Sequence, residues 1–230
     1  MQYPAVAIEI THPWENMYNF IPEGSGIAPP IDRNYVENDY FPNYLMRREL
    51  QPNETYTYGS RINKVIEDLN IIKNADNREL QITQLDRVVD MLKKTPLTNQ
   101  AVIEIASPDD LVECYGNDGK LDPPCLRLID FKVFPTFCQD FKNGECNSIK
   151  YAEKFCPKLC EWKTLTMSVY FRSWDLWAGF PSNLCGLELL KQYVASECNL
   201  INGAMFAYSS GLHIYGYQEE IAKLRLHRSK

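Results

Sequence analysis

The chain has 230 residues, of which 45% are hydrophobic and 23% are charged, and its formal net charge is −6. This length and composition predict one domain with a buried core, and the negative charge argues against a nucleic-acid or anionic-membrane partner. No apolar run of about eighteen residues is present, so we predict no transmembrane helix. Residues 1–15 lack a basic segment followed by a long apolar core, which predicts no signal peptide and a cytoplasmic location.

The N-terminal part contains two predicted strands separated by an irregular segment. Residues 3–10 alternate weakly between apolar and polar side chains, as a strand does. Residues 22–44 are rich in Pro, Gly, Asn and Asp, which indicates a long irregular segment. Residues 55–62 alternate again and predict a strand that ends at Gly59.

Two adjacent arginines, Arg47 and Arg48, follow the irregular segment. In a chain of net negative charge such a pair usually lies on the surface. It could also serve an anionic ligand, and Arg48 is therefore a candidate substrate-binding residue.

The middle of the chain predicts an amphipathic helix and a short strand. Residues 81–94 place five apolar side chains on one helical face, namely Ile82, Leu85, Val88, Val89 and Leu92. Pro96 ends this helix. Residues 101–105 then predict a short strand, and residues 107–110 a turn.

Cys125 is a candidate nucleophile. Two prolines fix the backbone before it, and the strand-like run that follows extends to Val133. A cysteine at the mouth of a strand, with a positive neighbour that favours thiolate, has the form that attacks electrophiles. The alternative is a small buried hydrophobic residue, which is the commoner role of an intracellular cysteine.

A Cys-rich insertion is predicted at residues 134–164. It holds four of the eight cysteines with the spacing C-x7-C-x9-C-x3-C: Cys138, Cys146, Cys156 and Cys160. Four thiolates suit a structural zinc ion, although the usual C-x2-C pair is missing. Two disulfides satisfy the same count equally well, and four free thiols remain the third possibility.

Residues 165–190 combine a strand, a polar loop and a helix. Alternation over residues 165–171 predicts the strand, and helical spacing of apolar residues from Leu187 onward predicts the helix. The loop between them is dense in polar residues, including Arg172, Ser173, Asp175 and Asn183. Chemistry often occurs where a strand leads through a loop into a helix. The alternative is an ordinary loop whose arginine and aspartate pair with each other.

The last candidate residues are His213 and Tyr215, within residues 207–224. We predict that Gly211 turns the chain, that His213 and Tyr215 share one face of a strand, and that residues 218–224 form a terminal helix. A single histidine is more often structural than catalytic, and a nearby tyrosine changes this only slightly.

With these segments in view, the chain resembles the short archaeal-type branch of the thymidylate synthase and pyrimidine hydroxymethylase family. The likeness extends over residues 55–59, 81–108, 122–133 and 169–224 in the order that the family requires. Three motifs carry it: the Pro-Cys pair of LDPPCLRLIDF, the run RSWDLWAGFPSN and the run GLHIY. Together in order and register they are much more specific than any one alone.

The resemblance implies roles for the residues of the first two motifs. Cys125 would attack C6 of the pyrimidine and make C5 a nucleophile. Arg172 would contact the 5′-phosphate and favour the Cys125 thiolate, and Ser173 would join the phosphate contacts. Asp175 would bind the ring amide of the pterin. Asn183 would offer an acceptor to uracil N3–H and a donor to O4.

The third motif and the departures from the family pattern complete the implied site. His213 and Tyr215 would hold the 3′-hydroxyl of the deoxyribose. The paired arginines that family members donate across the dimer to the phosphate correspond here to Asn99 and Gln100. Arg47 and Arg48 are candidates to compensate for them. The Cys-rich insertion is also foreign to the family core.

From the strand pattern and the resemblance we predict an α+β fold over residues 1–230 as a single catalytic domain. A large twisted mixed sheet would carry helices on one face and meet a second copy with the other, as a homodimer. The implied reaction is methylation of dUMP to dTMP with 5,10-methylenetetrahydrofolate or a methylene-tetrahydropterin analogue. The alternatives are a dUMP or dCMP hydroxymethylase, in which water captures the exocyclic methylene, and a non-catalytic nucleotide-binding homologue.

Overall fold

The computed structural model describes most of the chain, in six ranges: residues 2–15, 17–18, 31–66, 81–116, 122–135 and 163–225. All four cysteines of the predicted insertion, Cys138, Cys146, Cys156 and Cys160, lie outside these ranges. Zinc binding or disulfide formation by them therefore stays a prediction. Within the described ranges, Cys125, Cys185 and Cys198 are free thiols.

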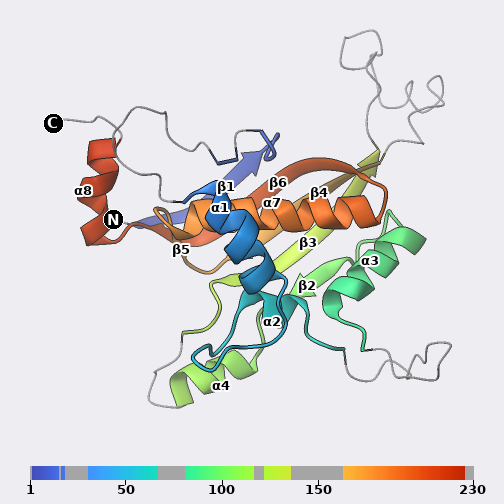
Figure 1. The fold of residues 1–230 in the computed structure, drawn as a ribbon, viewed down its shortest axis with the longest axis horizontal. Coiled ribbons are helices and arrows are strands. Elements are labelled where there is room, and N and C mark those ends of the chain that lie inside the picture. Colours follow the sequence, from blue (N-terminus) through green and yellow to red (C-terminus); the bar gives the residue numbers. More distant parts are fainter. Residues whose placement is uncertain are drawn as a thin grey trace, which may run out of the picture.

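A mixed sheet forms the centre of the fold (Figure 1). Its six strands are β1 (Gln2–Ile10), β2 (Val102–Glu104), β3 (Leu126–Pro135), β4 (Lys163–Phe171), β5 (Trp174–Asp175) and β6 (Ile201–His213). The order across the sheet is β1-β6-β4-β3-β2, and β5 extends the parallel pairing along β6. The β4–β6 pair is parallel, whereas β1–β6, β3–β4 and β2–β3 are antiparallel.

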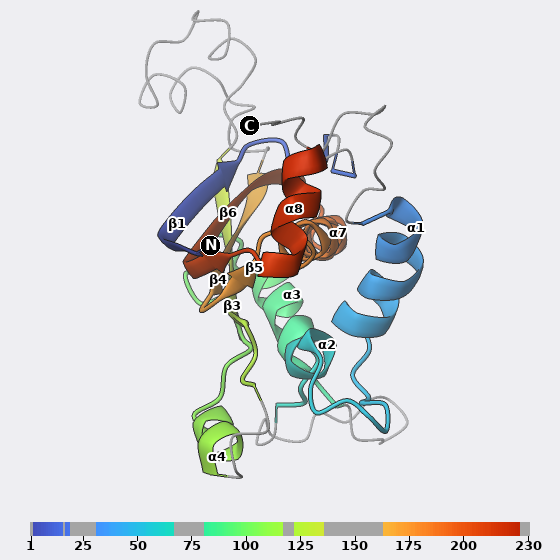
Figure 2. The same cartoon turned by 90° about the vertical axis from the view of Figure 1, so that its left-hand side faces the viewer.

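Most of the helices gather on one face of this sheet, whereas the helix at Asp109–Gly116 lies beyond one end of the sheet (Figure 2). They are α1 (Arg33–Tyr35), the π-helix η1 (Val36–Leu45), α2 (Tyr58–Ile62), α3 (Gln84–Lys94), α4 (Asp109–Gly116), α7 (Gly179–Glu197) and α8 (Gly216–Arg225). The long helix α7 contacts β4, β5 and β6 and packs against η1. No helix among the described residues is long and apolar enough to cross a membrane.

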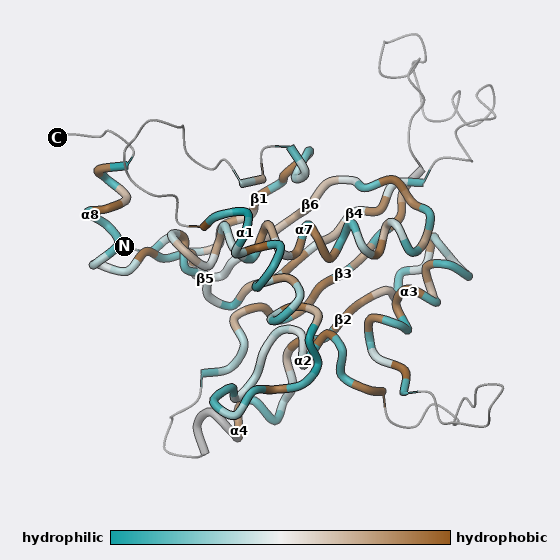
Figure 3. Tube along the Cα trace, in the orientation of Figure 1, coloured by the Kyte–Doolittle hydropathy of each residue, from teal (hydrophilic) through white to brown (hydrophobic). Residues whose placement is uncertain are grey.

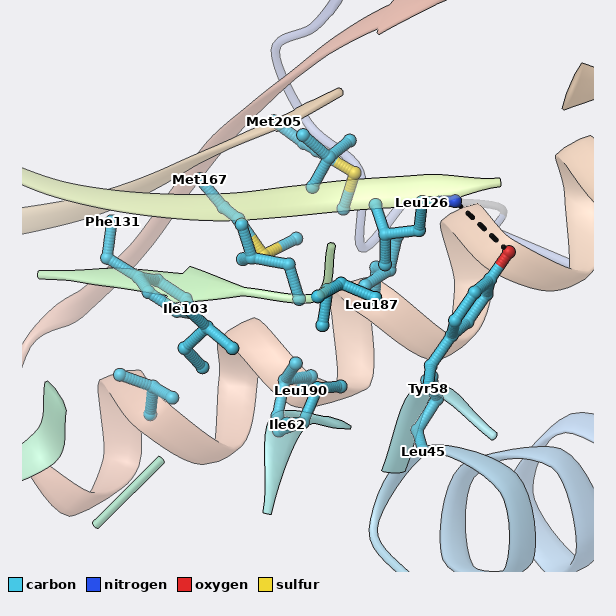
Figure 4. Packing of buried hydrophobic residues seen from close by; sticks show 14 of the residues in the cluster. Leu45, Tyr58, Ile62, Ile103, Leu126, Phe131, Met167, Leu187, Leu190 and Met205 are labelled. Carbon is cyan, nitrogen blue, oxygen red and sulfur yellow. Dashed lines mark hydrogen bonds between the residues drawn. The ribbon is translucent and has the colours of Figure 1, made fainter. Parts of the chain in front are cut away.

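The hydrophobic core fills the space between the sheet and α7. Every second residue of β4, from Leu165 to Phe171, is buried, which is the period of a strand with one covered face. Leu187 and Leu190 of α7 are fully buried among them (Figure 4). Most residues of β2 and β3 have hydrophobic colours in Figure 3, as expected for strands that border this core. The predicted α+β class, with helices flanking a mixed sheet, is confirmed.

The predictions for the N-terminal part were right for one element and wrong for two. The strand predicted at residues 3–10 is β1. Within the described part of the predicted irregular segment, residues 33–45 are helical, and the Asp32 carboxylate caps their start by accepting from Tyr35 N at 2.8 Å. Asp and Asn side chains that suggest turns in a sequence also cap helices, which explains the error.

Residues 58–62, predicted as a strand, form the short helix α2 instead. Its start carries a capping box, in which Thr57 Oγ1 accepts from Ser60 N at 3.0 Å and Thr57 N donates to Ser60 Oγ at 3.1 Å. Gly59 allows this helix to lie directly against η1, because a Cβ there would collide with the Arg47 and Tyr44 carbonyls. The local capping signal competes with the alternating pattern and prevails.

The C-terminal part also corrects two predictions. Gly211 does not turn the chain, since it lies within β6 opposite Pro4 of β1. His213 is the last residue of that strand, and Tyr215 follows it rather than sharing its face. The amphipathic helix predicted at residues 81–94, the strands at 101–105 and 165–171, and the terminal helix are confirmed as α3, β2, β4 and α8.

Candidate active site

Cys125 lies immediately before β3, half-buried, and its backbone is tied to the end of β4. The Cys125 carbonyl accepts from Arg172 N at 2.9 Å, so the thiol and the arginine side chain start from adjacent strand ends. Pro123 and Pro124 are buried just before it, which fixes the approach of the chain. The predicted proximity of Cys125 and Arg172 is therefore a feature of the fold.

The Arg172 guanidinium holds the diproline segment from the other side. Its Nη2 donates to the Pro123 carbonyl at 2.7 Å and its Nε to the Pro124 carbonyl at 3.3 Å. Arg127 adds a third contact, with Nη1 donating to the same Pro124 carbonyl at 3.2 Å. Because backbone carbonyls accept all three bonds, the cysteine is placed by main-chain contacts.

The thiol of Cys125 experiences opposing effects on its pKa. Burial raises the pKa above its ordinary value, and this effect outweighs the nearby Arg172 and Arg127, which lower it. The carboxylate of Asp122 adds to the increase. Asp122 is almost fully exposed, with 97% of its side chain accessible, so water screens its influence. Arg172 favours the thiolate, as predicted, but it only makes the net increase in the pKa of Cys125 smaller.

Tyrosines from the N-terminal helices surround the cysteine, and sequence reasoning missed them. The Tyr58 hydroxyl accepts from Leu126 N at 3.4 Å, as Figure 4 shows. Tyr44 stands edge-on to Tyr58 with ring centroids 5.3 Å apart, and Tyr56 lies 6.4 Å from Tyr58. Burial raises the pKa of each, for Tyr56 to about 12, and Cys125 contributes to all three increases. The repeated Tyr of TYTYGS was the available signal, but it suggested a strand.

Ser173 and His213 lie in contact with each other. Ser173 Oγ lies 3.3 Å from His213 Nδ1, and the His213 ring stands edge-on to Tyr215 at 4.9 Å. The parallel pairing of β5 with β6 creates this contact, because Asp175 is registered with His213 at the strand ends. A hydroxyl, an imidazole and a phenol thus line one edge of the loop after β4.

Asp175 accepts backbone hydrogen bonds where α7 begins. Its Oδ1 accepts from Trp177 N at 3.1 Å, and its Oδ2 accepts from Ala178 N at 3.2 Å and Gly179 N at 3.3 Å. A carboxylate is well placed there because the N-terminal N–H groups of a helix lack partners. The alternative reading of an Arg172–Asp175 pair is wrong, since each side chain bonds to backbone instead.

Asn183, in the second turn of α7, has both ends of its amide engaged in a buried site. Its Oδ1 accepts from Trp174 Nε1 at 2.8 Å, and its Nδ2 donates to the Tyr40 hydroxyl at 2.5 Å. The side chain is only 8% exposed. Tyr40 comes from η1, which the sequence analysis had assigned to an irregular segment, so neither partner was foreseen.

Arg48 makes its hydrogen bond and ion pair outside this group. Its Nη1 donates to Gln81 Oε1 at 2.8 Å, and its Nε lies 3.4 Å from Glu49 Oε1. Arg47 pairs with Glu54 at 2.5 Å. The role of Arg48 in binding an anionic ligand stays a prediction. Within the described ranges, no three His, Cys, Asp or Glu side chains gather as a metal site.

Comparison with known protein families decides the affiliation of this site. The family model for thymidylate synthase matches residues 41–230, a range that includes every candidate residue from Arg48 to Tyr215. The chain belongs to the thymidylate synthase family. The predicted family and the α+β fold are thereby confirmed, and the fold centre with Cys125 and Arg172 lies inside the matched range.

The relatives in the thymidylate synthase family are distant. A Methanosarcina barkeri protein named "Putative thymidylate synthase" is 24% identical over 168 residues, 73% of this chain and 56% of its own length. A Methanococcoides burtonii protein of the same name is 24% identical over 208 residues, 90% of this chain and 71% of its own. The thymidylate synthase of Mycoplasma pneumoniae is 26% identical over 147 residues.

Coverage of these thymidylate synthases is partial. The chain aligns with 56% of the Methanosarcina protein and 40% of the Mycoplasma protein. Among solved structures, thymidylate synthase from T4 phage matches with a TM-score of 0.45 and 26% identity, over 65% of this chain and 41% of that one.

Proposed function

We propose that this protein is a thymidylate synthase that methylates dUMP to dTMP through a covalent bond between Cys125 and C6 of the uracil. One observation supports the proposal above the others. Cys125 is the only described free thiol beside a guanidinium that contacts its own backbone segment, and Ser173, which follows that arginine, contacts His213. Asn183 is joined by a hydrogen bond to Trp174, the next residue of the same loop. A nucleophile, an anion-binding group and a base-reading amide are the parts that this reaction needs.

The chemistry of the cysteine follows from its surroundings. The sulfur adds to C6, the C5–C6 double bond of uracil opens, and C5 gains the electron density to attack a one-carbon unit. Arg172 and Arg127 stabilise the thiolate against the burial that raises its pKa. Loss of the C5 proton and breakage of the bond between the transferred carbon and its carrier would follow. A hydride from the carrier would complete the methyl group, and cleavage of the sulfur–C6 bond would then restore the C5–C6 double bond and release the thiolate.

The nucleotide would be held by the groups around this thiol. Arg172 uses Nε and one Nη2 proton on the proline carbonyls, and its Nη2 lies 4.0 Å from Asp122 Oδ1. Its remaining N–H groups would bind the 5′-phosphate in competition with that exposed carboxylate. Ser173 adds a hydroxyl donor. His213 and Tyr215 would hold the deoxyribose 3′-hydroxyl, and the edge-on contact of their rings, with centroids 4.9 Å apart, supports a joint role.

The one-carbon donor would be a methylene-carrying reduced folate or a related tetrahydropterin, which supplies both the carbon and the hydride. The donor set fits such a ring at Asp175. Its Oδ1 accepts one backbone N–H and its Oδ2 accepts two, so Oδ1 retains a lone pair for a ring amide. Asp175 would orient the ring, and its backbone bonds keep the carboxylate from rotating.

We also propose that two copies associate through the sheet face opposite α7. On that face the Tyr170 and Tyr208 rings are stacked, with centroids 5.4 Å apart, and Tyr208 is 40% exposed. Phe206 is 38% exposed beside them, and residues of β1, β4 and β6 line a hollow of about 320 Å³ on the sheet. Large apolar side chains on a sheet face suit burial against a partner. Sedimentation at a monomer's mass would contradict this.

One assay with [5-³H]dUMP and methylenetetrahydrofolate tests the reaction. Tritium release together with a product of methyl mass is expected. Tritium release with a hydroxymethyl product would assign the protein as a hydroxymethylase instead. Nucleotide binding without tritium release would assign it as a non-catalytic binding protein, an alternative motivated by Asn99 and Gln100 at the positions of the family's phosphate arginines.

A further inference from the structure

The two ring partners of the Asn183 amide differ in what they accept. Trp174 Nε1 donates to Asn183 Oδ1 at 2.8 Å, and Asn183 Nδ2 donates to the Tyr40 hydroxyl at 2.5 Å. An indole N–H only donates a hydrogen bond, whereas a phenol hydroxyl donates or accepts. Tyr40 is therefore compatible with either end of the amide. Trp174 is compatible with the oxygen end alone.

This difference matters because an asparagine amide has two orientations. Rotation by about 180° exchanges its oxygen and its NH₂ group. In one orientation the amide complements uracil, which presents an N3–H donor and an O4 acceptor. In the other it complements cytosine, which presents an N3 acceptor and an amino donor. An asparagine that rotates freely therefore does not choose between the two bases.

In the observed orientation the remaining capacity of Asn183 matches uracil. Trp174 uses one of the two lone pairs on Oδ1, and Tyr40 uses one of the two N–H groups on Nδ2, so one acceptor and one donor remain. Gly179 lies one turn before Asn183, where a Cβ would stand 3.7 Å from Oδ1. The missing side chain keeps the space beside that oxygen free.

Rotation of the amide would bring two donors together in a buried place. The Asn183 NH₂ group would then face the Trp174 N–H, with Trp174 2% exposed and Asn183 8% exposed. Trp174 has little freedom to move away, because its ring stacks on Phe171 with centroids 4.0 Å apart and an interplanar angle of 6°. Phe180 packs at 4.6 Å from the same ring. A buried donor without an acceptor is unfavourable, so the rotated state is disfavoured.

We propose that Trp174 is a specificity-determining positioning residue, whose indole N–H fixes the Asn183 amide so that the site accepts a uracil nucleotide and rejects a cytosine nucleotide. The proposal rests on the proposed function, because it requires that Asn183 meets the pyrimidine. It goes beyond the asparagine itself, since it places the choice of base in a neighbouring ring that does not touch the substrate.

The test compares the affinities for dUMP and dCMP in wild type, Trp174→Phe and Tyr40→Phe, measured by calorimetric titration. Trp174→Phe should lower the preference for dUMP at least about tenfold, chiefly through tighter dCMP binding. Tyr40→Phe removes a hydrogen bond from the same amide but leaves the indole N–H in place. Tyr40→Phe should weaken the binding of both nucleotides and keep the ratio of the two affinities unchanged. Tighter dCMP binding is a gain that general structural damage does not produce.

Two further variants protect the comparison. Benzothienylalanine at position 174 keeps the two fused rings and replaces the N–H by sulfur, so it removes the donor without emptying the core. The benzothienylalanine variant should show the same loss of preference for dUMP as Trp174→Phe. It gives this readout even if the smaller phenylalanine ring impairs folding of Trp174→Phe. Trp14→Phe is the control, since the Trp14 ring contacts Lys191 Nζ at 5.7 Å and the His12 ring at 5.4 Å. It should leave the ratio unchanged.

The outcomes separate this inference from the reaction. If wild type prefers dUMP and both position-174 variants keep that preference, the role of Trp174 is overturned while the proposed reaction stands. A loss of preference in Tyr40→Phe equal to that in Trp174→Phe would overturn the asymmetry on which the inference depends. If wild type binds both nucleotides equally, the inference and the uracil assignment fail together, and the tritium assay reports on the chemistry independently.

Discussion

The environments of Cys125 and Asn183 are built from different kinds of contact. Cys125 is positioned through the backbone carbonyls of Pro123 and Pro124, which accept hydrogen bonds from Arg172 and Arg127. These bonds involve no side chain of the diproline segment. Asn183 is positioned through the side chains of Trp174 and Tyr40. The comparison teaches that the nucleophile depends on the path of the chain. The base-reading amide depends on the identity of its neighbours, so its specificity is the easier property to change.

The largest expected effect comes from removing the nucleophile itself. Cys125→Ser should lower turnover at least about a thousandfold, because a serine hydroxyl supplies almost no anion at neutral pH. Binding of dUMP and the unfolding midpoint should stay close to wild type. Cys198→Ser is the matched control, since Cys198 is half-buried beside Val89. Turnover retained by the first variant would end the assignment of Cys125.

Next in size is a substitution that keeps charge but removes the planar fork. Arg172→Lys leaves one compact ammonium in place of two directed donors, so the Pro123 and Pro124 carbonyls lose their shared partner. We expect kcat/KM for dUMP to fall by about a hundredfold, corresponding to about 2.7 kcal/mol. A lysine variant with full activity would show that charge alone suffices.

Asn183→Asp should change the choice of base rather than remove activity. Trp174 and Tyr40 can both donate to a carboxylate, which suits the cytosine amino group better than the uracil carbonyl. We expect the dUMP to dCMP ratio of kcat/KM to fall by about ten- to a hundredfold, or about 1–3 kcal/mol. Asn199→Asp, at an exposed residue with φ of 52°, is the control. Unchanged preference would refute the uracil reading.

The smallest expected effect concerns the pH dependence of the Cys125 thiol. Because its pKa is raised, the reactive thiolate increases as pH rises through and beyond the ordinary thiol range. Iodoacetamide alkylation at Cys125 should therefore accelerate with pH. Asp122→Asn removes a charge that raises the pKa, so the rate at fixed pH should increase, by about twofold at most because the group is exposed. A slower rate would contradict the sign.

Peptide mapping distinguishes alkylation at Cys125 from alkylation at the other thiols. Burial raises the pKa of Cys185 to about 12, and its Sγ donates to the Met17 carbonyl at 2.8 Å. Cys185 should therefore resist alkylation over the same range of pH. Equal labelling of Cys185 and Cys125 would contradict both the burial of Cys185 and its raised pKa.

How much of the structure the sequence predicts depends on how far apart in the sequence the interacting residues lie. Alternation identified β4 because one of its faces is covered by α7 and the other is not, which imprints the period directly. Cys125, Arg172 and Ser173 were found because each lies in a short local motif, and the family resemblance implied that the two motifs share one site. The pairing of Asn183 with Tyr40 joins residues 143 positions apart, and no local pattern reports such a contact.

The errors had a physical cause as well. In residues 33–45 the capping Asp32 and the internal Pro42 both look like breakers, but Asp32 starts a helix and Pro42 is accommodated inside the π-helix η1. In residues 58–62 a capping box overrides alternation. β6 was largely missed because Gly203 and Gly211 lie inside it, and glycine usually weakens a strand assignment.

The pairing of β1 with β6 has a consequence for the order of events during synthesis. Gln2 is registered with His213 and Ile10 with Met205, so β1 is synthesised well before the strand with which it pairs. Contacts of such long sequence separation form slowly, because a large loop must close before they are made. Until residues 201–213 emerge, the N-terminal strand has an unsatisfied edge, and chaperone binding during translation should concentrate there.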